Sequence, residues 1–197
     1  MDMFELIKTR RSTRKFTNRP LKQEQLEQII EAGRYAPSGG NNQTSHFIVI
    51  ENQNILKKLA TLVQEEFVKM EIEEGMYQSL INSINASQKG NYVFHYSPAA
   101  LIVLANQKNY GNAMADCSCA LENMMLMCNA LDLGSCWINQ LRWLNENKTI
   151  VEYLETLGLT QDEIVCGALS VGYPDTEDGL PHRKSLDRKG NKVTFIK

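Results

Sequence analysis

The sequence predicts one mixed domain of helices and buried strands packed in layers. Two continuous apolar runs of strand length, residues 98–105 and 164–171, flank a broad apolar stripe at helical spacing over residues 113–131. No linker, repeat or low-complexity segment interrupts the 197 residues, of which 43% are hydrophobic. A domain of this length buries roughly 70% of the surface that its unfolded chain exposes. We therefore expect a single domain over residues 1–197 whose core needs neither disulfides nor metal.

Two amphipathic helices are predicted in the first part of the chain. Asp2 and Glu5 form a capping-box pattern at the start of the first helix. Arg10 takes the next position on the apolar face of that helix, so an arginine stands where the periodicity expects an inward side chain. The second helix follows Pro20 and must end before Pro37.

The middle of the chain alternates between strand and helix patterns. Residues 47–50 read as a short strand and residues 53–74 as an acidic helix, whereas residues 75–96 have no clear assignment. The stripe over 113–131 is wide enough for a deeply buried or subunit-packing helix. Gly134 stands where a left-handed residue would end that helix.

The last part of the chain predicts a helix over residues 146–158 and, after the second buried strand, a terminal strand over residues 193–196. About twenty residues separate the two strands, enough to reach across a partner subunit.

The charge is nearly balanced but unevenly distributed. The chain has 21 Lys and Arg against 23 Asp and Glu, a formal net charge of −2. This balance argues against an obligate polyanion partner such as nucleic acid. Eleven of the 21 cations nevertheless lie in residues 8–19 and 182–192.

The termini and the cysteines indicate a cytoplasmic protein. The amino terminus lacks the features of a signal peptide, and no apolar run approaches the length of a membrane-spanning helix. Five cysteines, an odd number, suit a reducing compartment, and we expect buried, inert thiols. Cys117 and Cys119 would point to different faces of one helix, which is poor geometry for zinc, so we expect no metal site.

The sequence contains no hydrolytic triad motif, Walker loop or dinucleotide-binding glycine motif, so an enzyme of this sequence would use a cofactor for its chemistry. The most informative segment is 10–16, Arg-Arg-Ser-Thr-Arg-Lys-Phe, whose guanidinium and hydroxyl groups suit a phosphate. Cations at a helix C-terminus explain part of this segment, but not its density of charge.

Three further segments are weak when each is taken alone. Residues 36–43 combine glycines with amides that suit the polar edge of a heterocycle, although a plain loop is equally consistent. Residues 133–139 form a turn followed by an aromatic and an amide, and Trp137 is more often a packing residue than a functional one. Gly172-Tyr-Pro leads to a second cationic segment that begins at His182.

In this order and spacing, the four segments resemble the flavin-dependent nitroreductase family. The matching motifs are Arg-Arg-Ser-x-Arg-x-Phe at 10–16, Ala-Pro-Ser-x-x-Asn-x-Gln at 36–43, Gly-Ser-Cys-Trp-Ile at 134–138, and Gly-Tyr-Pro followed by Arg-Lys at 183–184. The resemblance covers nearly the whole chain except about residues 64–96.

The resemblance implies an α+β sandwich with a mixed, mainly antiparallel sheet flanked by helices, and a homodimer that exchanges its C-terminal strands. It also implies one FMN per subunit at the dimer interface, with the flavin rather than a side chain as the catalytic group. The residues implied to bind FMN are Arg10, Arg11, Ser12, Arg14, Pro37, Ser38, Gly40, Asn41, Gln43, Trp137, Ile138, Asn139, Arg183 and Lys184.

Among these residues, the first four would hold the phosphate and the pyrimidine edge, and Arg183 and Lys184 would close on the phosphate. The residues between 37 and 43 would come from the other subunit, and those at 137–139 would lie beside the reactive N5.

The implied reaction is a ping-pong hydride transfer from NADH or NADPH to a small-molecule electron acceptor such as a nitroarene or quinone. Positive charge near the flavin, for which Arg14 is the candidate, would stabilise its reduced form. Thr44, Ser45 and His46 replace the proline and aromatic that commonly follow Gln43 in the family, which changes the expected substrate side. The aromatic residues of 75–96 either cover the flavin or fill the core.

Two alternatives remain open from the sequence. A flavin enzyme of the same fold could carry out a specialised reaction, such as dehalogenation or flavin fragmentation. A protein that binds flavin or another anion without catalysis is the other alternative.

Overall fold

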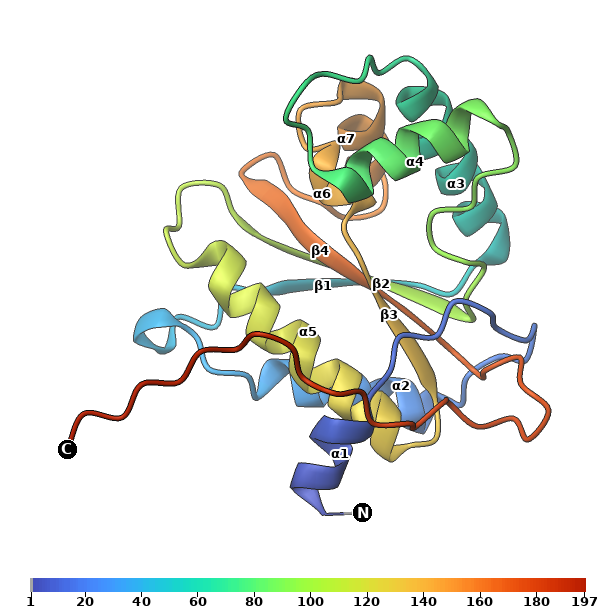
Figure 1. Ribbon diagram of the computed structural model, residues 1–197. Coiled ribbons are helices and arrows are strands. Elements are labelled where there is room, and N and C mark those ends of the chain that lie inside the picture. The colour runs from blue at the N-terminus through green and yellow to red at the C-terminus, as the bar shows by residue number, and fades with distance from the viewer. Residues whose placement is uncertain (1) are drawn as a thin grey trace.

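A four-stranded antiparallel sheet lies between two layers of helices in the computed structural model, which describes residues 2–197 (Figure 1). The strands are β1 (His46–Ile50), β2 (Ala100–Gln107), β3 (Gly134–Ile138) and β4 (Glu163–Gly172), in the order β1-β2-β4-β3. The helices are α1 (Met3–Thr9), α2 (Gln23–Arg34), α3 (Gln53–Val68), α4 (Gln78–Gln88), α5 (Ala113–Ala130), α6 (Gln140–Trp143) and α7 (Lys148–Glu155). This arrangement confirms the predicted α+β sandwich with a mainly antiparallel sheet.

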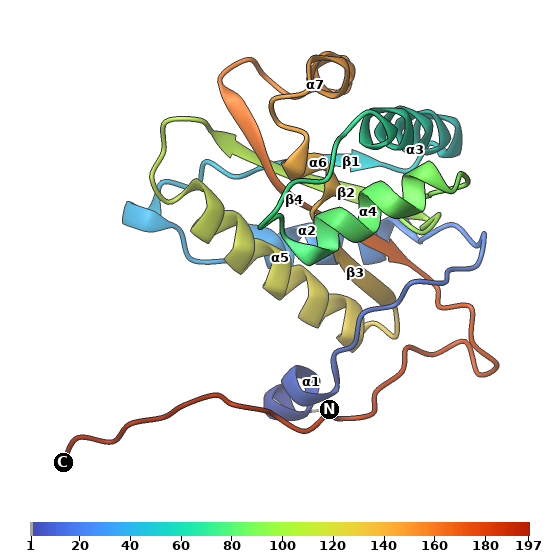
Figure 2. The same cartoon turned by 45° about the horizontal axis from the view of Figure 1, so that its top comes forward.

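The two faces of the sheet build two separate cores. Alternating side chains of β2 point to opposite faces, so Leu101 and Val103 pack toward α3, α4, α6 and α7, while Ile102 and Leu104 pack toward α2 and α5. Figure 2 shows the two helix layers on either side of the sheet. All seven residues from Ala100 to Asn106 are buried, which explains why this strand reads as a continuous apolar run.

The helix α5 follows its prediction closely, but the turn after it does not. The left-handed residue of this turn is Asp132 (φ 58°), and Gly134 is already the first residue of β3. A Cβ atom at Gly134 would lie 2.7 Å from Cγ2 of Thr13. The glycine is therefore needed for the close approach of the N-terminal segment, and the predicted role of Gly134 as the helix cap is wrong.

Two other helical segments differ from expectation. The helix predicted over 53–74 ends at Val68. The unassigned stretch contains α4, which begins one residue after Tyr77. Among the cysteines, Cys117, Cys128, Cys136 and Cys166 are buried, but Cys119 is exposed, so the expectation of five buried thiols is wrong at that position.

The C-terminal segment after β4 contains no helix or strand, and its last residues project from the body of the molecule, as both ribbon views show. Val193, Phe195 and Ile196 are 71%, 82% and 95% exposed. The predicted terminal strand is therefore absent from the single chain, because residues 193–196 have no strand beside them with which to form a ladder.

Candidate functional site

The N-terminal motif runs along the outer edge of β3. Ser12 forms a parallel bridge with Ser135, and the amide of Thr13 donates to the carbonyl of Ser135 at 2.8 Å. The absence of a side chain at Gly134 permits this approach. The first and third motifs, more than a hundred residues apart in sequence, therefore form one continuous surface.

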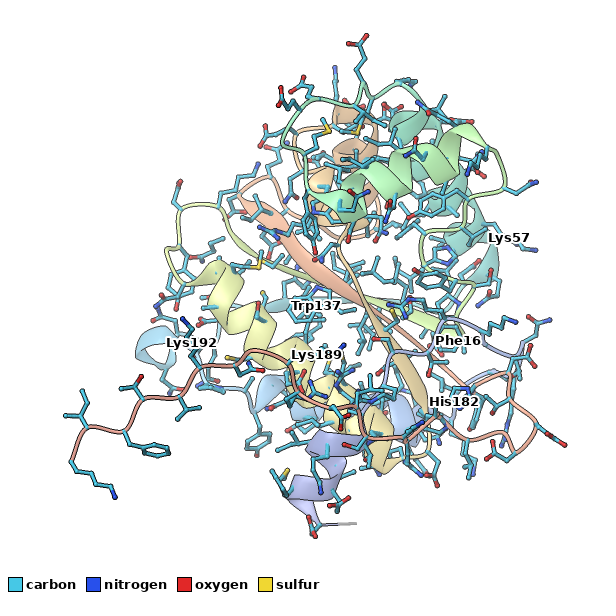
Figure 3. All side chains as sticks on the ribbon, viewed as in Figure 1. Phe16, Lys57, Trp137, His182, Lys189 and Lys192 are labelled. Carbon is cyan, nitrogen blue, oxygen red and sulfur yellow. The ribbon has the colours of Figure 1, made fainter. Side chains whose placement is uncertain are left out.

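The start of the fourth motif extends this surface. Phe16 bridges to Pro174, and the amide of Asp175 donates to the carbonyl of Lys15 at 3.0 Å. A pocket of about 140 Å³ lies between these segments, with Arg14 and His182 among its lining residues. Figure 3 shows Phe16 and His182 on these adjoining segments, while Lys57 projects from α3 in a separate part of the molecule.

Arg10 and Arg11 carry guanidinium nitrogens that are buried but have no hydrogen-bond partner. Within residues 2–197 these atoms are Nη1 of Arg10 and Nε of Arg11. Elsewhere on these side chains, Nη2 of Arg11 donates to the carbonyl of Lys8 at 2.6 Å, and Nε of Arg10 lies 3.8 Å from a carboxylate oxygen of Glu122. An unsatisfied buried donor on a cation is costly, so a bound anion would be stabilised here.

Like charges gather around these two arginines. Burial, followed by the charges of Arg10 and Arg188, lowers the pKa of Arg11. Cys136 of β3 lies close to the same charges. Burial raises the pKa of its thiol, whereas the neighbouring Arg14, Ser12 and Arg10 lower it. The residues of the first motif thus converge at the middle of β3, and this cationic edge has the chemistry of a phosphate site.

Arg14 lies over an aromatic ring. Its guanidinium carbon is 5.9 Å from the ring centre of Tyr96, a residue with φ 62°. The neighbouring His95 is buried, accepts from the amide of Ser97 and contacts the carbonyl of Leu56 through Nε2 at 3.0 Å. This turn places one aromatic of the unassigned stretch beside the cationic edge, with its ring partly buried against the core.

The side chains of the third motif, residues 137–139, differ in how accessible they are to a ligand. Nε1 of Trp137 donates to Oδ1 of Asn139 at 2.9 Å, and the indole lies against Gly167 of β4. Ile138 is only 2% exposed and belongs to the core on the α3 side of the sheet. A ligand along this part of β3 would therefore meet the backbone of Ile138 rather than its side chain.

Arg183 is engaged elsewhere in the single chain. Its guanidinium donates to the side chain and the carbonyl of Asn129 and pairs with Asp132 at 2.6 Å. These partners lie at the C-terminal end of α5, where a cation also suits the helix dipole. Lys184 is exposed. The phosphate contacts predicted for Arg183 and Lys184 remain predictions, and that of Arg183 would require its guanidinium to exchange partners.

The second motif lies apart from the other three within one chain. The amide of Gly39 donates to Asp116 in the first turn of α5, whereas Asn129 in the last turn donates to the carbonyl of Leu6. At 1.5 Å per residue these two anchoring points are about 20 Å apart along the helix. Figure 1 shows the 36–43 loop at one end of α5 and α1 at the other. The loop predicted to contact the same ligand therefore does not join the cationic edge of its own chain.

Sequence reasoning missed the residues that hold this loop. Asp116 is 6% exposed and Tyr110 donates to it at 2.8 Å. The sequence did contain an indication of this contact. Asp116 lies on the apolar face formed by Ala113, Cys117 and Ala120, and a carboxylate on a buried helix face needs a specific partner.

The described residues 2–197 contain no helix long and apolar enough to cross a membrane, and no group of three or more His, Cys, Asp or Glu side chains placed to hold a metal ion. The fold and the site together define an α+β protein with a cationic edge on a sheet.

Comparison with known proteins identifies the group to which this architecture belongs. Residues 7–173 match the model of the nitroreductase family. A relative from Archaeoglobus fulgidus, provisionally named an NADH dehydrogenase/NAD(P)H nitroreductase, is 31% identical over 180 residues, covering 89% of this chain and 87% of the relative. A crystal structure of a nitroreductase with bound FMN from Bacteroides fragilis is 30% identical, covers 100% of both chains and superposes with a TM-score of 0.87. The chain belongs to the nitroreductase family.

Proposed function

We propose that this protein is an FMN-dependent NAD(P)H oxidoreductase that reduces nitroaromatic, quinone or similar electron-poor acceptors. The observation that carries the proposal is the pair of buried, unpartnered guanidinium nitrogens of Arg10 and Arg11 at the edge of β3. The FMN bound to the Bacteroides fragilis nitroreductase and the name of the Archaeoglobus fulgidus relative support the same cofactor and electron donor.

The residues of the cationic edge fit the phosphate of FMN. Arg10 and Arg11 would donate to it, and Ser12 would supply a hydroxyl. Arg14, placed over Tyr96, would add positive charge beside the flavin ring and favour its reduced, anionic form. Trp137 and Asn139, which hydrogen-bond to each other, would orient the ring system along β3. The chain thus binds, orients and electrostatically tunes the cofactor.

When bound, FMN would supply the redox chemistry of the reaction, a ping-pong hydride transfer through N5 from NAD(P)H to the acceptor.

The separation of the 36–43 loop from the cationic edge supports a homodimer. Pro37, Ser38, Gly40, Asn41 and Gln43 are held at the opposite end of α5 from Arg10, so they would reach a flavin held by the partner subunit rather than by their own. The exposed apolar side chains of Val193, Phe195 and Ile196 would pack on that partner.

The visible spectrum of the purified protein tests this function. We expect a yellow protein with flavin absorbance bands that bleach anaerobically on addition of NADH or NADPH and return when a nitroarene or quinone is added. A colourless protein that does not retain added FMN would refute the proposal. A yellow protein that NAD(P)H bleaches but that transfers no electrons to these acceptors would point instead to a specialised reaction of the same fold.

A further inference from the structure

The loop that carries the second motif is held at one residue, Gly39, by two side chains near the start of α5. Its amide donates to both carboxylate oxygens of Asp116, at 3.1 and 3.3 Å. Its carbonyl lies 3.1 Å from the hydroxyl of Tyr110, which is also 2.8 Å from Asp116. The Gly39 amide is therefore bound by the carboxylate, and the single proton of the Tyr110 hydroxyl is shared between the Gly39 carbonyl and that carboxylate.

The absence of a side chain at Gly39 permits this close contact. A Cβ atom at position 39 would lie 2.1 Å from Nδ2 of Asn112 and 2.7 Å from the hydroxyl of Tyr110. Asn112 directly precedes α5, so the loop backbone is pressed against the N-terminus of this helix. Asp116 also lines a pocket of about 150 Å³ together with Ser38 and Gln43. Tyr110 and Asp116 thus contact the loop closely at Gly39.

The loop beyond Gly39 has an unfavourable backbone conformation that needs such support. Asn41 and Gln43 have φ values of 56° and 54°, in the left-handed region, which asparagine tolerates but which is unfavourable for glutamine. The internal hydrogen bonds of the turn begin at Ser38 and Gly39, whose carbonyls accept from Asn41 and Asn42. Holding Gly39 in place therefore also holds the first residues of the turn, from which its hydrogen bonds start.

We propose that Asp116 and Tyr110 are positioning residues that hold the Ser38–Gln43 loop in its FMN-binding conformation. The inference rests on the proposed function, in which this loop contacts the flavin of the partner subunit. Neither side chain need touch the cofactor. They order the loop before FMN binds. The loss of conformational entropy on ordering the loop therefore does not reduce the affinity for FMN. Helix α5 of one subunit would in this way determine the affinity of the other subunit's site.

Substitutions at the two positions test the proposal through the dissociation constant of FMN, measured by fluorescence titration of the apoprotein. Y110F removes one oxygen and is expected to weaken FMN binding about 2- to 10-fold, and D116A about 10- to 100-fold, because a charged acceptor is lost. D116N keeps an acceptor for the Gly39 amide and is expected to restore most of the affinity.

The matched control is S118A on the same helix, where the hydroxyl bonds only the carbonyl of Met114. It is expected to bind FMN like the wild type, and the thermal midpoint of the Y110F apoprotein should match that of the wild type. If D116A does not fold, Y110F and D116N decide the question. Wild-type affinity in Y110F, or failure of D116N to bind better than D116A, would overturn the positioning role.

A mixed dimer distinguishes action across the interface from action within a subunit. Pairing an R10A chain with a D116A chain would place both defects in one site and leave the other intact if the loop serves the partner's flavin. Half of the sites should then bind FMN with wild-type affinity. Mixed dimers without any tight site would overturn the cross-subunit assignment. A wild-type protein that does not bind FMN at all would instead refute the proposed function itself, on which this inference rests.

Discussion

At the residue scale, the cationic edge is distinguished by donors that the protein itself leaves unused. Clusters of arginine on a protein surface are usually solvated, but Nη1 of Arg10 and Nε of Arg11 are buried without a partner in the described chain. Burial and the nearby charges also lower the pKa of Arg11. These conditions are unfavourable without a ligand and favourable with a dianionic phosphate, so they indicate binding rather than structural support.

Replacement of Arg10 by alanine should therefore weaken FMN binding roughly 10- to 100-fold, the loss expected for a hydrogen bond between charged groups. Equilibrium dialysis of the apoprotein against FMN measures this constant. K57A is the control because Lys57 is an exposed cation on α3, away from the edge of β3. Equal affinity in R10A and K57A would contradict the phosphate assignment.

The sequence predicted which segments are rich in cations and hydroxyls, but not the individual contacts of their side chains. The spacing of cations and hydroxyls in 10–16 predicted the segment that meets β3, because that pattern is local. The engagement of Arg183 with Asn129 and Asp132 depends on the path of the C-terminal segment over α5, which no local pattern encodes. Asp116 was missed for the same reason, since its partner Gly39 is 77 residues away.

At the scale of elements, polar contacts between helices fix the layer that covers the face of the sheet opposite α5. Glu66 near the end of α3 accepts from Lys69 at 2.5 Å and from Asn147, the N-cap of α7, at 2.7 Å. The side chain of Glu66 is 9% exposed. Lys69 and then Asn147 lower the pKa of Glu66, while its burial acts against them. One carboxylate thus joins two helices that are 80 residues apart in the chain.

The lowered pKa of Glu66 makes its contribution to stability depend on pH. Because the folded-state pKa lies below the unfolded value, the stabilisation is present above the unfolded pKa and is lost as pH falls through the folded one. E66Q should be less stable than the wild type at pH 7 by about 1–2 kcal/mol. The difference should shrink progressively below about pH 4.5. Urea unfolding at pH 7 and at pH 3.5 measures it.

The exposed neighbour Glu65 provides the control, since E65Q changes the same charge without touching α7. A stability difference between E66Q and wild type that stayed constant over this pH range would show that packing rather than ionisation accounts for it.

The sequence predicted helices and strands correctly wherever the hydrophobic pattern extended over many residues. The apolar stripe of α5 and the buried runs of β2 and β4 gave correct elements because burial on one or both faces dictates the residue pattern. The end of α3 at Val68 and the presence of α4 were not predictable in this way. Both lie in a region of mixed polar and aromatic residues, where tertiary contacts such as the hydrogen bond from the Tyr92 amide to Gln64 decide the structure.

At the scale of the whole molecule, the described chain has features that a second copy would complete. The 36–43 loop and the cationic edge lie toward opposite ends of α5, and the C-terminal segment extends from the body with its apolar side chains exposed. The sequence predicted a strand at 193–196, but a strand requires a neighbour, and the pattern alone does not say on which molecule that neighbour lies. In this respect the terminal strand remains a prediction about the assembly.

Removal of residues 192–197 should weaken the proposed homodimer. Val193, Phe195 and Ile196 are exposed in the single chain, and burying an apolar side chain of this size contributes on the order of 1.5–3 kcal/mol. Sedimentation velocity over a range of protein concentrations should show dissociation at concentrations where the full chain is dimeric. Deletion of Lys197 alone should leave the dimer unchanged. A truncated protein that remains as dimeric as the full chain would contradict strand exchange.

The pairing of Ser12 with Ser135 has a consequence for solubility. β3 is an edge strand of the sheet, and an edge strand with free backbone groups is a template for pairing with strands of other molecules. The Arg10–Phe16 segment covers part of that edge and surrounds it with positive charge, which repels a second copy approaching edge to edge. The segment proposed to bind the phosphate would therefore also protect the edge of the sheet from aggregation, and both roles would depend on the close approach that Gly134 allows.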